Sequence, residues 1–381
     1  MGLSAVPLFA AYIAYPLAVY AERLFDISVA RNWIDALWLV LLFFAVLFVL
    51  QRQKFALRKS TALALALCTA VLALVAVFKF GAPLAHSKVT AVPYLMELKP
   101  LYYLAVSMVL FFAFGPPKPR DFVRFGLWLA GFLILEFCLG RLISDLPLRP
   151  FGSGEVNYDA CLLLVSLCMG TAAEQSSRKT RIWIFLGIAA SLSRTATAAA
   201  AVVFLVSPNT RPWKKMLMVG ACAGAFALSF ALREIPAQGL ESLERYWMWL
   251  AGIDLVAHNP IQGLFGFTAG LPLPAKTPDA LFGLWLAQQR TWEISGIFPF
   301  HFHSFWLRAV LTWGLVAVGA AIFLGALFLK KHPHPVFISL AALCAVMGLT
   351  MGLFYLSNVA VPLYLAFAAA AYPRRIPDAQ T

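Results

Sequence analysis

The feature that most constrains this chain is a succession of uninterrupted apolar runs, each about 17–25 residues long. A run of that length covers the roughly 30 Å hydrocarbon core of a bilayer as an α-helix. Membrane β-strands would instead alternate apolar and polar residues over about 10 positions. Only 12% of the 381 residues are charged, against about 25% in soluble domains. We therefore predict an all-α integral membrane protein with about twelve transmembrane helices.

The formal net charge of +13 lies largely in short links between the apolar runs. In a soluble domain such a charge favours nucleic-acid binding, but in a membrane protein it is typical of loops retained in the cytoplasm. We expect membrane lipids, and no nucleic acid, around this chain. With twelve spans and both termini inside, six basic links are cytoplasmic, at residues 52–59, 118–124, 178–181, 211–215, 330–331 and 374–375.

The chain divides into three predicted parts. Residues 1–232 hold transmembrane helices one to nine, residues 233–303 form one large periplasmic loop, and residues 304–381 hold the last three helices and a cytoplasmic tail. The loop carries four basic and six acidic residues, so it lacks the positive bias of the other links. Spans are predicted at residues 6–21, 34–50 and 61–78, and a link at 79–100 separates the third from a fourth span that ends near residue 115. Later spans are predicted at 125–143, 158–173, 216–232, 304–329, 336–354 and 359–372. Two short spans are predicted within residues 182–206, between the spans at 158–173 and 216–232.

The run at residues 182–206 is unusual because Arg194 lies near its middle. A charge at the bilayer centre costs about 2.5–3.5 kcal/mol on insertion scales. Both flanks of the run are basic, and two cytoplasmic flanks require an even number of crossings between them. We therefore predict two short helices that meet at Arg194, in a recess on the periplasmic side.

Polar residues in and beside the periplasmic loop are the candidates for function. Arg245 lies on a predicted amphipathic helix within residues 241–260, where an ion pair with Glu241 is the alternative to a binding role. His301 and His303 precede the span at 304–329, and no third ligand is spaced for a metal site. Two further arginines complete the set, Arg290 in the loop and Arg308 one turn into the span; the latter binds phosphate or pairs with an acid in the bundle.

Three motifs resemble those of the O-antigen ligase and polymerase superfamily of bacterial membrane glycosyltransferases. They are S-L-S-R-T-A at residues 191–196, the helix and Pro-then-Gly turn at 244–267, and His303-Ser304 followed by nine residues and then Gly314. Their order, predicted sidedness and spacing carry the resemblance together. Ala317 stands where the ligase signature usually has Gly, Thr or Tyr, so ligase and polymerase both stay open here.

The resemblance implies a metal-independent and cofactor-independent transfer on the periplasmic face of the bacterial inner membrane. The donor is a glycan on undecaprenyl pyrophosphate, and the acceptor is a sugar hydroxyl of lipid A-core or a second lipid-linked glycan.

The chemistry of that transfer assigns a role to each candidate. A guanidinium holds phosphate oxygens through a rigid fork, which suits Arg194 and Arg245 as a pyrophosphate clamp. A neutral imidazole accepts a proton near neutral pH, which suits His303 as the base. Further substrate contacts are predicted at Arg290, Arg308 and His301. A transporter is the third hypothesis, and it is disfavoured because we find no internal repeat and because the polar groups cluster on one predicted face.

Overall fold

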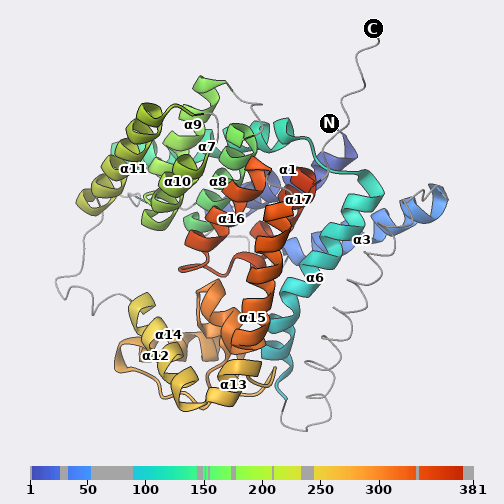
Figure 1. Ribbon diagram of the computed structural model, residues 1–381, viewed down its shortest axis with the longest axis vertical. Helices are drawn as coiled ribbons and strands as arrows, with labels where there is room; N and C mark the ends of the chain where they lie inside the picture. The colour runs from blue at the N-terminus through green and yellow to red at the C-terminus, as the bar shows by residue number, and fades with distance from the viewer. Residues whose placement is uncertain are drawn as a thin grey trace. The chain divides into compact units, whose positions relative to one another are not determined.

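A computed structural model of the chain describes residues 2–25, 33–52, 89–143, 149–150, 152, 155–172, 177–207, 210–232, 244–331 and 334–371 (Figure 1). Within these ranges the protein is helical and contains no strand, only one isolated bridge between Leu273 and Ile297. The all-α prediction is confirmed for this part of the chain. Its elements are η1 (Leu3–Ala5), α1 (Val6–Phe9), the π-helix η2 (Ala10–Ala14), α2 (Tyr15–Phe25), α3 (Trp33–Arg52), α6 (Ala91–Phe114), α7 (Pro119–Leu142), α8 (Val156–Ala172), α9 (Arg178–Ala190), α10 (Arg194–Val206), α11 (Pro212–Leu232), α12 (Glu244–His258), α13 (Pro260–Phe265), α14 (Asp279–Trp292), η5 (Pro299–His301), α15 (Phe305–Lys331), α16 (Pro335–Met347), η6 (Leu353–Tyr355) and α17 (Ser357–Ala371).

Several of these helices suit a bilayer. In the described part of the chain, five helical stretches are long and apolar enough to cross a membrane: Leu3–Glu22, Ala91–Phe114, Pro119–Leu142, Pro212–Leu232 and Phe305–Lys330. Five shorter apolar helices accompany them. These lengths and compositions indicate a membrane protein. The count of twelve spans and the periplasmic loop stay predictions, and the predicted span at 61–78 lies outside the described residues.

The chain forms two compact units, which we describe separately. The first contains residues 1–46, 102–235 and 327–381, and the second contains residues 47–101 and 236–326. In the first unit α8 is the central helix, and it contacts α7, α9, α10, α16 and α17 (Figure 1). Glycines let α7 approach its neighbours closely: a Cβ on Gly126 would lie 2.4 Å from Ser166 Oγ of α8, and one on Gly187 would lie 2.7 Å from the Ala130 backbone.

The N-terminal helices and α7 run in the same direction. The ring of Phe9 contacts that of Phe125, and further along both helices the ring of Tyr20 contacts that of Phe132. These are the first and fifth predicted spans, and odd-numbered spans must cross a membrane in the same direction. The observed orientation is therefore the one that the predicted topology requires of this pair.

The predicted break at Arg194 is confirmed. Helices α9 and α10 contain 13 residues each and are joined by a turn at residues 191–193. Thirteen residues rise about 20 Å, which is less than the roughly 30 Å hydrocarbon core. Leu192 in the turn has φ 51°, and Ser193 caps α10 by accepting a hydrogen bond from the Ala196 N–H (3.3 Å).

The second unit is built on a core that α12, α14 and the start of α15 share. Its buried side chains include Met248, Leu255, Trp285, Phe302 and Leu307. The helix α6 begins at Ala91, about nine residues before the end of the link predicted at 79–100. In the second turn of this helix the side chain of Glu97 is fully buried and forms the ion pair described below.

A glycine breaks α15 and lets a distant segment enter. Gly314 has φ 84° and ψ 159°, which favours glycine. A Cβ at this position would lie 2.2 Å from the Leu264 carbonyl oxygen. The freed carbonyl of Leu311 accepts a hydrogen bond from the Phe267 N–H (2.8 Å). The break therefore fixes the turn after α13 against α15, which gives the glycine of the third sequence motif a structural role.

Candidate functional site

His303 is an exposed imidazole at the head of α15. Ser304 follows it, and its Oγ accepts a hydrogen bond from the Leu307 N–H (3.3 Å), which caps the first turn of the helix. The Nε2 atom of His303 lies 3.0 Å from Nε2 of Gln288 on α14. A hydrogen bond donated by this amide requires the neutral tautomer of His303 that carries its proton on Nδ1. Gln288 thus orients the ring and leaves it accessible to solvent.

His301, two residues earlier, lies in the opposite environment. It is fully buried and packs face to face with Phe300, with 4.3 Å between the ring centroids. Its Nδ1 accepts a hydrogen bond from the Phe298 N–H (3.0 Å). Burial lowers the pKa of His301 from 6.5 to about 4. This histidine is therefore neutral at physiological pH and is held as part of the core.

Three buried polar atoms next to His303 lack a hydrogen-bond partner among the described residues. They are Nε1 of Trp285, Oε1 of Gln288 and Nε2 of His301. Trp285 and Gln288 lie three residues apart on one face of α14, and the Trp285 ring contacts that of His301 at 6.3 Å between centroids. A buried donor or acceptor left unpaired costs about 1–3 kcal/mol. These three atoms are therefore the polar groups of this core whose hydrogen bonds the described residues do not supply.

Two predicted arginines of the second unit are exposed. Arg245 is the second residue of α12, and the Glu241 carboxylate proposed as its partner lies outside the described residues. Arg290 lies in the last turn of α14, two residues after Gln288. Residues two apart on a helix are separated by about 200°, so Arg290 and Gln288 occupy different faces of α14. The structure does not bring Arg290 beside His303.

Arg308 forms a buried ion pair, the second of its two predicted alternatives. The residue is 7% exposed, and its guanidinium lies 3.1 Å from Oε1 of Glu97, which is fully buried. It also donates to the Met96 carbonyl oxygen (2.6 Å), and Thr312 donates to the same carboxylate (2.6 Å). These contacts hold α15 to the first turns of α6. We therefore assign Arg308 to the structure of the unit and not to the exposed site.

Arg194 occupies a polar turn in the first unit. It is the first residue of α10, is partly buried, and its Cζ lies 3.8 Å from the centroid of the Phe230 ring on α11. Beneath it, Ser193 donates to Oδ1 of Asn157 (2.7 Å), which also accepts from Arg149 (2.9 Å). This network ties the α9–α10 turn to the start of α8.

The predicted site residues thus fall into both units. Arg194 belongs to the first unit, and Arg245 and His303 belong to the second. Their convergence stays a prediction. The described residues hold no group of three or more His, Cys, Asp or Glu side chains that could bind a metal.

The sequence analysis did not identify the residues that contact the predicted site residues and orient their side chains. Leu281, Trp285 and Gln288 follow the spacing i, i+4, i+7 of a buried helix face. A glutamine on such an apolar stripe was the available signal for a polar function. Asn157 and Arg149 had no comparable signal, because their role depends on a turn 36 residues beyond Asn157.

Comparison of the chain with protein-family models, with curated protein sequences and with solved structures finds no significant match.

Proposed function

We propose that the protein is a membrane glycosyltransferase of the O-antigen ligase type. It moves a glycan from undecaprenyl pyrophosphate to a sugar hydroxyl of lipid A-core on the periplasmic face of the bacterial inner membrane. The acceptor oxygen attacks the anomeric carbon, and the bond from that carbon to the pyrophosphate oxygen breaks. The pyrophosphate leaves with the bonding electron pair, and the acceptor proton passes to Nε2 of His303 after the acceptor hydroxyl has displaced the Gln288 amide from that atom.

The observation that carries the proposal is the contrast between the two histidines of the second unit. His303 is exposed and oriented by Gln288, whereas His301 is buried with a lowered pKa. A base must reach its proton at hydrogen-bond distance, so of the two only His303 meets the requirement.

Two arginines supply the features that a pyrophosphate needs. Arg194 and Arg245 both lie in the first turn of a helix, where backbone N–H groups have no partner within the helix and the helix dipole is positive. A cation at this end is unfavourable on its own, and an anion bound there relieves it. In the transition state the leaving pyrophosphate gains negative charge, which both guanidiniums would stabilise.

The polymerase alternative uses the same residues with a different acceptor, a second lipid-linked glycan. We expect purified full-length protein in lipid nanodiscs to convert lipid-linked glycan plus lipid A-core into lipopolysaccharide. Product that lengthens with the donor alone identifies a polymerase. Absence of transfer with either acceptor, from folded protein that binds the donor, contradicts both and favours a transporter.

A further inference from the structure

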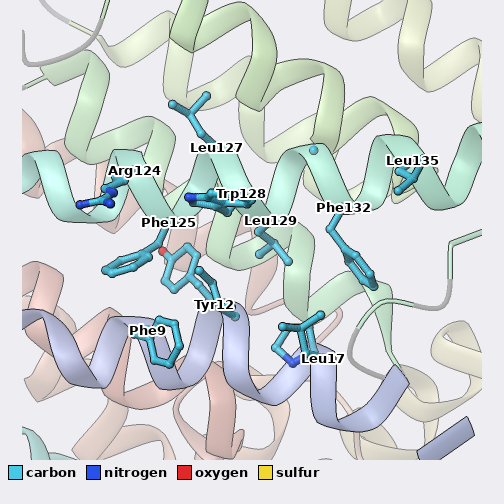
Figure 2. Close-up of a pocket in the computed structure, with 13 residues that line it drawn as sticks. Phe9, Tyr12, Leu17, Arg124, Phe125, Leu127, Trp128, Leu129, Phe132 and Leu135 are labelled. Atoms are coloured by element: carbon cyan, nitrogen blue, oxygen red, sulfur yellow. The ribbon is translucent and has the colours of Figure 1, made fainter. Parts of the chain in front are cut away.

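An apolar groove opens between the N-terminal helices and α7 in the first unit. It has a volume of about 900 Å³, and its walls are aromatic and aliphatic side chains of α1, η2, α2 and α7. Figure 2 shows Phe9, Arg124 and Phe125 toward one end and Leu17, Phe132 and Leu135 toward the other. The groove therefore follows the long axes of two helices that we expect to span the bilayer.

The groove walls offer an alkyl chain an apolar surface and offer a polar ligand very little. Trp128 is 66% exposed and Leu17 is 52% exposed, although both line the groove. The hydroxyl of Tyr12, a lining residue, already donates to the Leu162 carbonyl oxygen (2.8 Å) and accepts from Ser166 (3.1 Å). In a membrane, contact with lipid tails fills such a space at no desolvation cost.

One end of the groove carries positive charge. Arg124 lines the groove, is exposed, and lies in the second turn of α7. Lys118 and Arg120 precede it at the same helix end, where the dipole is also positive. The nearby carboxylate of Asp121 accepts a hydrogen bond from the Lys118 backbone N–H (3.1 Å), which completes the helix cap. Of these charges, the Arg124 guanidinium lines the groove and complements a phosphate group held level with the second turn of α7.

We propose that the groove binds an anionic glycerophospholipid from the leaflet beside residues 118–124. One acyl chain lies along the groove between α7 and the N-terminal helices, and the headgroup phosphate contacts Arg124. The inference does not depend on the proposed glycosyl transfer, because none of its residues belongs to the candidate site.

The test uses Trp128 as an internal reporter. Full-length protein is placed in nanodiscs that contain brominated phosphatidylglycerol or brominated phosphatidylcholine, and tryptophan fluorescence is compared between the wild type and Trp128→Phe. Bromine quenches a tryptophan only at contact. We expect the quenching assigned to Trp128 to be stronger with the glycerol lipid at equal mole fraction.

Matched charge variants locate the headgroup. Arg124→Gln should weaken the preference for phosphatidylglycerol about five-fold, the effect of one basic residue near a charged surface. Arg120→Gln removes the same charge one turn earlier, outside the groove lining, and should change the preference less than two-fold. Equal quenching by both lipids, or equal effects of the two substitutions, overturns the proposal. Protection of Trp128 from both lipids in a dimeric preparation also overturns it, because a second copy of the chain then covers the groove.

Discussion

Two turns, one in each unit, place a functional candidate at the head of a helix and do so by different means. In the first unit, residues 191–193 reverse the chain so that Arg194 begins α10 beneath a Ser193 cap. In the second, residues 298–304 lead into α15 beneath a Ser304 cap, with His303 just outside the helix. Arg194 is partly buried against an aromatic ring, whereas His303 is exposed beside an amide.

The difference shows that residues of the same type are distinguished as functional candidates by their burial and their contacts. His301 and His303 are two residues apart, yet only one of them is open to a ligand. Arg194 and Arg308 are both charges within predicted apolar spans; Arg308 lies in a buried ion pair with Glu97, and Arg194 lies over the Phe230 ring. Arg194 and His303 therefore stay candidates for the proposed transfer, whereas Arg308 and His301 belong to the packed interior of the second unit.

The largest expected effect concerns the two histidines. His303→Ala should lower the rate of glycan transfer by about 10²–10⁴-fold, the usual contribution of a general base. His301→Phe preserves a buried aromatic ring and should keep transfer within a few-fold of the wild type. Single-turnover rates with lipid-linked glycan measure both. Full activity of the His303 variant would remove the proposed base.

Breaking the buried ion pair should destabilise the second unit without touching the exposed site. Glu97→Gln leaves the Arg308 guanidinium buried without its counter-charge, which costs about 3–5 kcal/mol. The double variant Glu97→Gln with Arg308→Met should recover much of this loss. Thermal unfolding in detergent measures the order of the three proteins. A single variant as stable as the wild type would show that the pair carries no net energy.

The lowered pKa of His301 predicts how stability depends on pH. Below pH 6.5 the unfolded chain binds a proton at this histidine, whereas the folded chain does not until about pH 4. Stability should therefore fall between pH 6.5 and 4, by about 3 kcal/mol from this group. The neighbouring positive groups are Arg308 and, when protonated, His303, and both oppose protonation of His301.

The measurement is the unfolding midpoint of the wild type and of His301→Phe from pH 7 to pH 4. The difference between the two proteins isolates His301 from other titrating groups. The wild type should lose more stability on acidification than the variant. Parallel curves would mean that His301 is accessible to protons in the folded protein.

A smaller effect on the transfer rate is expected from a substitution of Arg194, beside the turn at residues 191–193. Arg194→Lys keeps the charge and loses the planar fork, so transfer should slow by roughly ten- to a hundred-fold, the range for one charge-assisted hydrogen bond. Arg178→Lys makes the same change at the exposed start of α9 and should leave the rate unaltered. Unchanged turnover of the Arg194 variant would make this residue a structural anchor over Phe230.

Local signals in the sequence predicted the elements that depend on neighbouring residues. The charge of Arg194 between basic flanks predicted the α9–α10 break, and continuous apolar runs predicted the helices. The sequence did not reveal what depends on distant pairing. Arg308 and Glu97 are 211 residues apart, so neither the ion pair nor the early start of α6 could be read from either segment.

In the candidate site, too, the features set by neighbouring residues were predicted and the contacts between distant residues were not. The spacing of His303, Ser304 and Gly314 placed the imidazole at the head of a helix. The partner Gln288 lies 15 residues earlier on another helix, and only its position on an apolar stripe pointed to it. The burial of His301 follows from its stacking on Phe300, which a two-residue spacing does not encode.

The proposed function requires Arg194 and His303 to act on the same substrate. Its most direct test is cross-linking with a short bismaleimide in full-length protein that carries Arg194→Cys and His303→Cys, with Cys68 and Cys138 replaced by serine. A matched pair uses Arg178→Cys, about 20 Å from Arg194 at the other end of α9. The account predicts an intramolecular cross-link for 194–303 and none for 178–303. No cross-link at 194–303, or preferential cross-linking at 178–303, would contradict it.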